Sequence, residues 1–577
     1  MSRFLRFAVE QTLDGKNDEL KEYSIALEVF DKDESFDPRI DPTVRSEARR
    51  LRTKLAEYYE SGDGGDEIVI ELPKGSYIPV FRNVRGGSAP AAAPAPVRAR
   101  RWYLLVAAAL LIGAGLAWWL LRRPAPQPPR SIAVLPFENL SADPANEYFS
   151  DGLTEEVLNA LANIPGFKVA ARTSSFQFKG KHESIQSIGK KLNVEVVLEG
   201  SVRKEGDRIR ITPQLINVAD GYHLWSTEYD REWKDLFGVQ RDIATAIAAV
   251  LGGKLGHAEP RPVDAETYRL YLEGRYHFDK WNAAEMSKAI PLFEQAIARD
   301  PNYAPAFSSV AAAYGLLAAF GGTTIPHEVS SAKSKAAALK AIELDPASGE
   351  GWVALAPHLV EEFDWPAAES AFHKAIALSP NSVDAHAYFA ELYLTPTGRL
   401  DEALREAQIA VGLDPISPYA ITMVGRRYYF LRQYDSAIAW LRKALDLEPR
   451  FNLAVSPLMH SYLSKQDVKG ARDFLEASKP YLGERSLALE WSKVYAAEGN
   501  RAEALKSLDA AAAGIGNGCA VAEVYLELGD RAQALSWLDR TIEGRSACSQ
   551  GIPADPRLDK LRQTPEYEAL MHKMKLR

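Results

Sequence analysis

The chain has 577 residues, a formal net charge of −8 at pH 7 and two cysteines. This length allows three or four domains with cores of their own. The net charge excludes a general polycation, so any contact with nucleic acid must be local. Two cysteines exclude a disulfide framework and a cysteine-based zinc cluster. Cys519 and Cys548 can form one pair or remain two thiols, and the sequence leaves both open.

Residues 1–84 predict three helices followed by a β-hairpin. A short amphipathic helix ends at Gly15, a second spans 20–30, and Asp41-Pro42-Thr43 opens the third with an N-cap acceptor and a helix-initiating proline. Apolar residues recur in the third helix at three- and four-residue steps and predict a buried stripe. The members of this stripe are Val44, Ala48, Leu51, Leu55 and Tyr58. The hairpin is expected from strands at 67–72 and 77–81, joined by a PKGS turn.

The third helix leaves basic and hydroxyl side chains on its other faces. They are Arg45, Ser46, Arg49, Arg50, Arg52 and Thr53. A helix of this kind can enter the major groove of DNA while Lys74, in the turn of the hairpin, touches phosphate. A solvated charged helix without a ligand is the alternative reading of the same charge pattern.

The stretches LKEYSIALEVF, DPTVRSEARRLRTKL and IVIELPKGSYIPVF resemble the OmpR/PhoB-type winged-helix effector domain. In that family a recognition helix of the form V-x-x-x-x-x-R-L-R-x-K-L precedes a wing that ends in G-x-Y, and Val44, 50–52, 54–55 and 75–77 occupy those places. The resemblance implies a DNA-binding domain over 1–84 that uses the six helix residues above together with Lys74. The small antiparallel sheet that opens the family domain is missing.

Residues 102–121 contain no charged side chain and lie between Pro/Ala-rich linkers at 85–101 and 122–130. Twenty helical residues at about 1.5 Å each cover the roughly 30 Å core of a bilayer. Aromatic residues at both ends favour the headgroup level. The sequence therefore predicts a single transmembrane helix. Arginines are nearly balanced on its two sides, so their distribution does not decide the orientation. The DNA-binding resemblance instead places the N-terminus in the cytoplasm and the C-terminal region in the periplasm, on the two sides of a bacterial inner membrane.

Residues 131–258 predict a compact α/β domain with helices packed on a mixed sheet. Its expected elements are strands at 131–137 and 167–171, helices at 147–164, 184–192 and 239–251, and a hairpin over 194–218. The runs AVLPFENLS, YFSDGLTEEV and EGSVRKEGDRIRITPQLI resemble the TolB N-terminal-like domain. This resemblance implies binding or sensing and supplies no catalytic residue. The polar residues 172–175 could line a ligand groove or form a simple strand-end loop.

Residues 262–577 repeat a helical pattern whose units end in a proline. These prolines are Pro301, Pro346, Pro380, Pro415 and Pro449. After the first gap their spacing is close to the period of paired helices stacked as a solenoid. The units resemble tetratricopeptide repeats, which implies a concave surface for proteins or peptides. A spacer or an oligomerisation platform is the alternative.

No motif for a phosphate loop, a dinucleotide fold or a metalloprotease is present, so the sequence predicts no catalytic residues, no cofactor and no metal site. The α/β and repeat regions resemble those attached to class III nucleotide cyclases, but no cyclase catalytic domain accompanies them, and we predict that the chain is not an enzyme. The predicted fold class is multidomain, α and α/β: a winged helix, a single transmembrane helix, a TolB N-terminal-like domain and an α-solenoid.

This layout resembles ToxR-like membrane regulators. The resemblance implies a membrane-anchored transcriptional regulator that senses protein or peptide signals outside the cytoplasm, and a homodimer on two half-sites is expected with it. The alternative is a membrane-tethered interaction scaffold or an envelope assembly factor that does not bind DNA.

Overall fold

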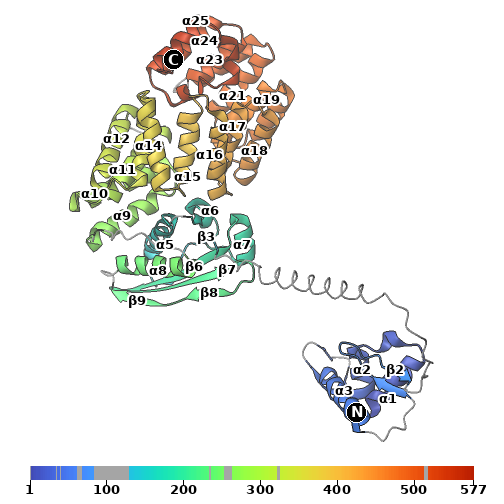
Figure 1. The fold of residues 1–577 in the computed structure, drawn as a ribbon. Helices are drawn as coiled ribbons and strands as arrows, with labels where there is room; N and C mark the ends of the chain where they lie inside the picture. The colour runs from blue at the N-terminus through green and yellow to red at the C-terminus, as the bar shows by residue number, and fades with distance from the viewer. Residues whose placement is uncertain are drawn as a thin grey trace, which may run out of the picture. The chain divides into compact units, whose positions relative to one another are not determined.

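The computed structural model describes residues 2–33, 36–38, 41–61, 68–83, 129–164, 166–232, 236–252, 261, 263–320, 325–512 and 518–576. The chain divides into two compact units, residues 1–123 and 124–577. Figure 1 draws both as a ribbon that runs from blue at the N-terminus to red at the C-terminus.

The first unit packs three helices around a small apolar core. Its elements are α1 (Ser2–Leu13), η1 (Asn17–Glu19), α2 (Glu22–Phe30), α3 (Thr43–Ser61), β1 (Ile68–Glu71) and β2 (Val80–Asn83). The predicted stripe of α3 is confirmed at Val44, Ala48 and Leu51, which are buried in this core. The prediction that Tyr58 belongs to the buried stripe is wrong, because its side chain is mostly exposed. Its neighbour Tyr59 faces the hairpin instead, and its hydroxyl accepts a hydrogen bond from the Ile70 backbone N–H at 3.1 Å.

The start of α3 and the strands of the hairpin follow from local chemistry. The carboxylate of Asp41 accepts from the Thr43 backbone N–H at 2.9 Å, as the predicted helix start requires. The second strand begins later than predicted, because Glu71 pairs with Val80 as the last rung of the antiparallel ladder. Tyr77 and Ile78 pack against the helical core, and Pro79 has no N–H to give to a ladder.

The second unit begins with an α/β domain built on one mixed sheet. Its strands are β3 (Ser131–Val134), β4 (Glu138–Asn139), β5 (Lys168–Val169), β6 (Val196–Glu205), β7 (Arg208–Asn217), β8 (His223–Ser226) and β9 (Tyr229–Glu232). Its helices are η2 (Pro144–Asn146), α5 (Glu147–Ala162), α6 (Arg172–Phe176), α7 (Ile185–Leu192) and α8 (Leu236–Val250). The strand order is β5-β3-β6-β7-β8, with β4 also paired to β6 and β9 to β7. The predicted hairpin turns at Gly206, whose φ is +59°.

Alternation along the strands places helices on both faces of this sheet (Figure 1). Ile132 and Val134 of β3 face one side, where they share a core with α5, α8 and the first repeats. Ala133, between them, faces the other side and packs with Ile188 and Leu192 of α7. The core of the α/β domain is therefore continuous with that of the solenoid.

The rest of the second unit is a solenoid of paired helices, as predicted. First helices are α9 (Ala265–Phe278), α11 (Ala304–Phe320), α13 (Gly349–Glu361), α15 (Val383–Tyr388) with η4 (Phe389–Leu394), α17 (Pro418–Phe430), α19 (Asn452–Ser464), α21 (Glu484–Ala497) and α23 (Gly518–Glu527). Second helices are α10 (Ala283–Arg299), α12 (His327–Leu344), α14 (Trp365–Leu378), α16 (Leu400–Leu413), α18 (Tyr434–Leu447), α20 (Val468–Ser478), α22 (Arg501–Ala512) and α24 (Arg531–Glu543). Each repeat proline predicted from the sequence lies two residues after the end of a second helix, because the residue before a proline disfavours the helical conformation.

Close packing within a repeat leads to a testable prediction at Gly274 of α9. A Cβ atom built there would lie 2.5 Å from the ring of Phe293, which is fully buried in α10. We expect Gly274→Ala to destabilise the first repeat by about 1–3 kcal/mol through overpacking. Gly412→Ala is the matched control, because nothing lies within 4 Å of its added Cβ in α16, and alanine should stabilise that helix by about 0.5–1 kcal/mol. Hydrogen exchange of the two helices measures both changes.

The C-terminal segment folds back onto the solenoid. It contains η5 (Ala547–Gly551), η6 (Pro556–Leu561) and α25 (Pro565–Lys573). Trp365 donates from Nε1 to the Met574 backbone oxygen at 2.7 Å, so the segment reaches from the last repeats to α14. Cys519 and Cys548 form a disulfide between α23 and η5, with Cα atoms 6.2 Å apart.

The predicted membrane-spanning architecture requires correction. Within the described residues no helix combines the length and apolar character needed to cross a bilayer. The stretch 102–121, on which the prediction rested, lies outside those residues. Long apolar helices that are described, such as α11, are covered by neighbouring helices of the solenoid. The apolar residues of such a helix are therefore buried by protein. The fold class is a helical solenoid joined to a sheet domain. The same finding contradicts the predicted single-pass, inner-membrane localisation with a cytoplasmic N-terminus and a periplasmic C-terminal region.

Candidate nucleic-acid interface

The exposed side of α3 gathers four of the residues predicted to contact DNA. At about 100° per residue, the positions opposite the buried Val44–Ala48–Leu51 stripe lie three and four residues apart. These positions are Ser46, Arg49, Arg50 and Thr53, and all four side chains are exposed. They form a single row along the solvent side of the helix, and we call it the α3 face.

The two arginines of the α3 face are held only loosely by the protein. Arg50 keeps two thirds of its side chain exposed, and its Nη1 atom lies 3.7 Å from Oε1 of Glu47 on the same helix. Such a surface pair contributes little to stability. The Arg49 side chain is exposed as well, and the Thr53 hydroxyl donates to the Arg49 backbone oxygen at 3.3 Å. Both guanidinium groups can therefore exchange water for a ligand at small cost.

Arg45 lies at the edge of the α3 face and is tied to the rest of the unit. Its Nε donates to Oε1 of Glu22 in α2 at 2.8 Å, and its Nη2 donates to the Pro38 backbone oxygen. About half of the side chain remains exposed. The structure therefore does not place Arg45 in the same free position as Arg49 and Arg50.

Arg52 points toward the hairpin and not toward solvent. Its Nε donates to the Leu72 backbone oxygen at 3.0 Å, and its Nη2 donates to the Ser76 backbone oxygen at 2.9 Å. Lys74 lies between those two acceptors, exposed at the tip of the turn, where Gly75 has a φ of +81°. Helical periodicity alone groups Arg52 with its basic neighbours, because the hairpin that it contacts lies twenty residues away in sequence.

The polar residues 172–175 of the α/β domain form part of an internal interface. The hydroxyls of Thr173 and Ser174 donate to the carboxylate of Asp414, the latter at 2.5 Å. Asn381 donates to the backbone oxygens of Ala162 and Phe167 at 2.8 and 3.0 Å. Neither reading that the sequence left open for 172–175 describes these contacts. The residues form helix α6, and the hydroxyls of Thr173 and Ser174 meet Asp414 in the loop that precedes α17.

Two arginines and two carboxylates reinforce the same interface. Arg275 of α9 pairs with Glu155 of α5, and Arg172 lies 3.1 Å from Oδ2 of Asp279 and 3.6 Å from Oε2 of Glu155. Burial works against the charge on Glu155, yet the guanidinium groups of Arg275 and Arg172 lower its pKa overall. The cluster thus joins the α/β domain to the first repeat through buried ion pairs.

Glu156, the neighbour of Glu155 on α5, is expected to make this interface sensitive to pH. Burial and the Glu155 carboxylate raise the pKa of Glu156 to about 8, from an ordinary 4.5, while Arg275 and the Tyr271 hydroxyl act in the opposite direction and Glu350 adds to the rise. Between these values the folded state binds more protons than the unfolded state, so stability falls as pH rises. We expect Glu156→Gln to match the native chain near pH 5 and to melt at a higher temperature near pH 9. Glu328→Gln, at an exposed position of α12, should show no such difference.

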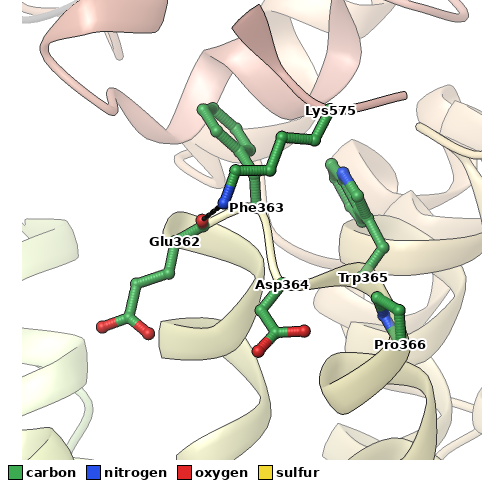
Figure 2. Close-up of a pocket in the computed structure, with 6 residues that line it drawn as sticks. All are labelled: Glu362, Phe363, Asp364, Trp365, Pro366 and Lys575. Carbon is green, nitrogen blue, oxygen red and sulfur yellow. Dashed lines mark hydrogen bonds between the residues drawn. The ribbon is translucent and has the colours of Figure 1, made fainter. Parts of the chain in front are cut away.

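A hollow of about 600 Å³ at the turn before α14 does not have the features of a site. In Figure 2, Lys575 lies over Glu362 and donates from Nζ to its backbone oxygen at 3.4 Å. The carboxylates of Glu362 and Asp364 point away from that ammonium group. Since its charged groups do not converge, the hollow offers no focus for a ligand.

Two family models match parts of this chain, and one of them describes a transcriptional regulator. Residues 129–245 match the family described as HilA/YgeH-like transcriptional regulator, second domain, and residues 419–451 match the tetratricopeptide repeat. A curated protein of Rhizobium meliloti (strain 1021), "Putative adenylate cyclase 3", is 41% identical over 195 residues, which are 32% of this chain and 33% of that protein. The chain therefore spans about a third of the length of this relative. The Arabidopsis thaliana Hsp70-Hsp90 organizing protein 3 is 30% identical over 90 residues, 16% of each chain.

Solved structures with a similar arrangement are more distant. The human IFIT1 dimer with m7Gppp-AAAA is 18% identical, with a TM-score of 0.39, and the match covers 53% of this chain and 77% of that one. A thermophilic TPR protein of Thermus thermophilus is 16% identical, with a TM-score of 0.29, over 34% and 99% of the two chains. The two family matches together describe a regulatory protein with a protein-interaction region.

Proposed function

We propose that this protein is a transcriptional regulator that binds duplex DNA through α3 and the hairpin of its first unit. The observation that carries the proposal is the α3 face, where two exposed arginines and two exposed hydroxyls stand in one row opposite the buried stripe. The match of residues 129–245 to the second domain of HilA/YgeH-like regulators supports the regulatory part. We assign the chain a binding role and no catalytic one.

In this proposal α3 enters the major groove as the recognition helix of a winged-helix domain. Arg49 and Arg50 hydrogen-bond to guanine edges or to phosphates, and Ser46 and Thr53 add hydroxyl contacts. Lys74 meets the phosphate backbone from the hairpin, and Arg45 contacts phosphate at the edge of the α3 face. One domain of this size covers few base pairs, so we include a homodimer on two half-sites about one helical turn apart.

The second unit would receive a protein or peptide signal through its tetratricopeptide repeats. Stacked repeats offer an extended concave surface for such partners. The α/β domain shares a core with the first repeats and is fastened to the loop residues Asn381 and Asp414. A partner bound to the repeats would therefore act on a body that includes the α/β domain.

The test is selection of duplexes from a random pool by the full-length chain, followed by titration of the enriched sequence. We expect specific binding at least about a thousandfold tighter than binding to unrelated duplex. We also expect the logarithm of the binding constant to fall linearly with the logarithm of salt concentration between about 50 and 200 mM, as phosphate contacts release counterions.

Two other results would count against the proposal. If no sequence is enriched and the chain retains no duplex even at about 50 mM salt, the first unit does not read DNA. The chain would then act as an interaction scaffold, the alternative that the sequence leaves open. If duplex is retained without sequence preference, the regulator assignment is wrong while a non-specific DNA contact stands.

A further inference from the structure

Arg52 was expected to contact DNA, but the structure gives it a different set of partners. One guanidinium group donates to the backbone oxygens of Leu72 and Ser76, at 3.0 and 2.9 Å. These acceptors flank the turn that carries Lys74 at its tip. The planar fork of arginine suits two acceptors in fixed directions, and hydrogen bonds from a charged donor are stronger than those between neutral groups.

The other contacts of the turn hold its two ends and not its tip. The Ile78 backbone N–H donates to the Ser76 hydroxyl at 3.1 Å, on the C-terminal side of the tip. The β1–β2 ladder ends at the pair Glu71 and Val80, so residues 72–79 lie outside it. Within the turn the Ser76 backbone N–H donates to the Pro73 oxygen at 3.3 Å, a long hydrogen bond. Leu72 and Ile78 anchor the two ends in the apolar core, but the tip itself is exposed. Arg52 therefore ties both sides of the exposed tip to the rigid helix α3 by hydrogen bonds.

We propose that Arg52 is a positioning residue, which fixes Lys74 relative to the α3 face so that the hairpin and the helix meet one duplex together. The inference rests on the proposed function, since it assigns a role within the same DNA interface. It separates two groups of basic side chains on α3: Arg49 and Arg50 contact the ligand, and Arg52 acts through Lys74.

The experiment is a double-mutant cycle between Arg52 and Lys74 in the full-length chain, with the selected duplex as probe. The quantity compared is the salt slope, the slope of the logarithm of the binding constant against the logarithm of the salt concentration. Lys74→Ala is expected to reduce its magnitude by about one, because one phosphate contact is lost. Arg52→Met should reduce it by about the same amount, and the double variant should lose no more than either single one. Arg52→Lys keeps the charge but cannot span both carbonyls, so it should behave like Arg52→Met.

Hydrogen exchange of residues 72–78 in the free protein supplies a second readout that needs no DNA. Faster exchange in both Arg52 variants, with native exchange in α1 and α2, is the expected result and shows that the unit stays folded. Losses of slope that add in the double variant, or native affinity in Arg52→Lys, would mean that Arg52 touches the duplex itself. Unchanged exchange of the turn would likewise overturn the proposal. Failure of the native chain to bind duplex would instead remove the proposed function, and the exchange result would still decide whether Arg52 holds the turn.

Discussion

A chain in which Arg49 and Arg50 are both replaced by alanine is expected to bind its selected duplex at least about thirtyfold more weakly than the native chain. Each arginine that contacts a base edge contributes about 1–3 kcal/mol, and the lower bound for two is about 2 kcal/mol, or about thirtyfold. Both side chains are exposed, and the pair between Arg50 and Glu47 is a surface one. The fold should therefore survive, and the thermal melt of the variant checks this.

The control for this prediction is Arg3→Ala combined with Arg6→Ala. These exposed residues of α1 belong to the same unit, so the control removes the same charge from a different face. Arg3 gives up an exposed ion pair with Asp31, at 2.8 Å, and a hydrogen bond to the Glu28 backbone oxygen, also at 2.8 Å. Fluorescence anisotropy at one salt concentration compares the two double variants. An equal loss of affinity in both would show that net charge, and not the α3 face, holds the duplex.

Much of α3 could be predicted because its signals are local. The Asp41 carboxylate lies two residues from the N–H that it caps, and the apolar stripe repeats within two turns of one helix. Helical geometry then fixes which side chains lie opposite the stripe, so the exposure of the α3 face was predictable, although the sequence grouped Arg45 and Arg52 with it. The roles of those side chains toward DNA remain a prediction.

The partners of Arg52 and the register of the hairpin could not be predicted in the same way. Both depend on contacts between segments about twenty residues apart, where tertiary packing decides among locally equivalent conformations. Tyr77 and Ile78 alternate as a strand would, yet they pack against the helices and leave the ladder to begin at Val80. Pro79 was the signal that could have moved the strand boundary.

The repeats were predictable and the interface with the α/β domain was not. The repeat prolines mark helix ends because the residue before a proline disfavours the helical conformation, and their regular spacing separates them from prolines inside helices such as Pro291 of α10. Asn381 and Asp414 lie in the same kind of turn, but nothing local distinguishes a turn residue that faces solvent from one that binds α5 or α6. The pairing of Cys519 with Cys548 depends in the same way on how the C-terminal segment folds back.

The second large effect is expected at Glu391, whose replacement by alanine should destabilise the middle repeats by about 3–5 kcal/mol. Glu391 lies in the π-helical segment η4, where it accepts from Arg427 and lies 2.5 Å from Nη2 of Arg426. Arg427 is fully buried, and burial lowers its pKa. Loss of the carboxylate would leave this guanidinium without its paired anion. Native-state hydrogen exchange of α17 measures the change. Glu503→Ala, which breaks an exposed pair with Lys506, should cost at most about 1 kcal/mol.

A double variant separates the effect of charge from that of shape at this position. Glu391→Leu combined with Arg427→Met removes both members of the buried pair and keeps much of their volume. Replacing a buried ion pair by apolar groups is often close to neutral, so α17 should exchange more slowly in the double variant than in Glu391→Ala. Arg426 would lose its partner as well, but it is partly exposed and can turn to water. If the double variant is as unstable as the single one, the packing of η4, and not the uncompensated charge, determines the stability of these repeats.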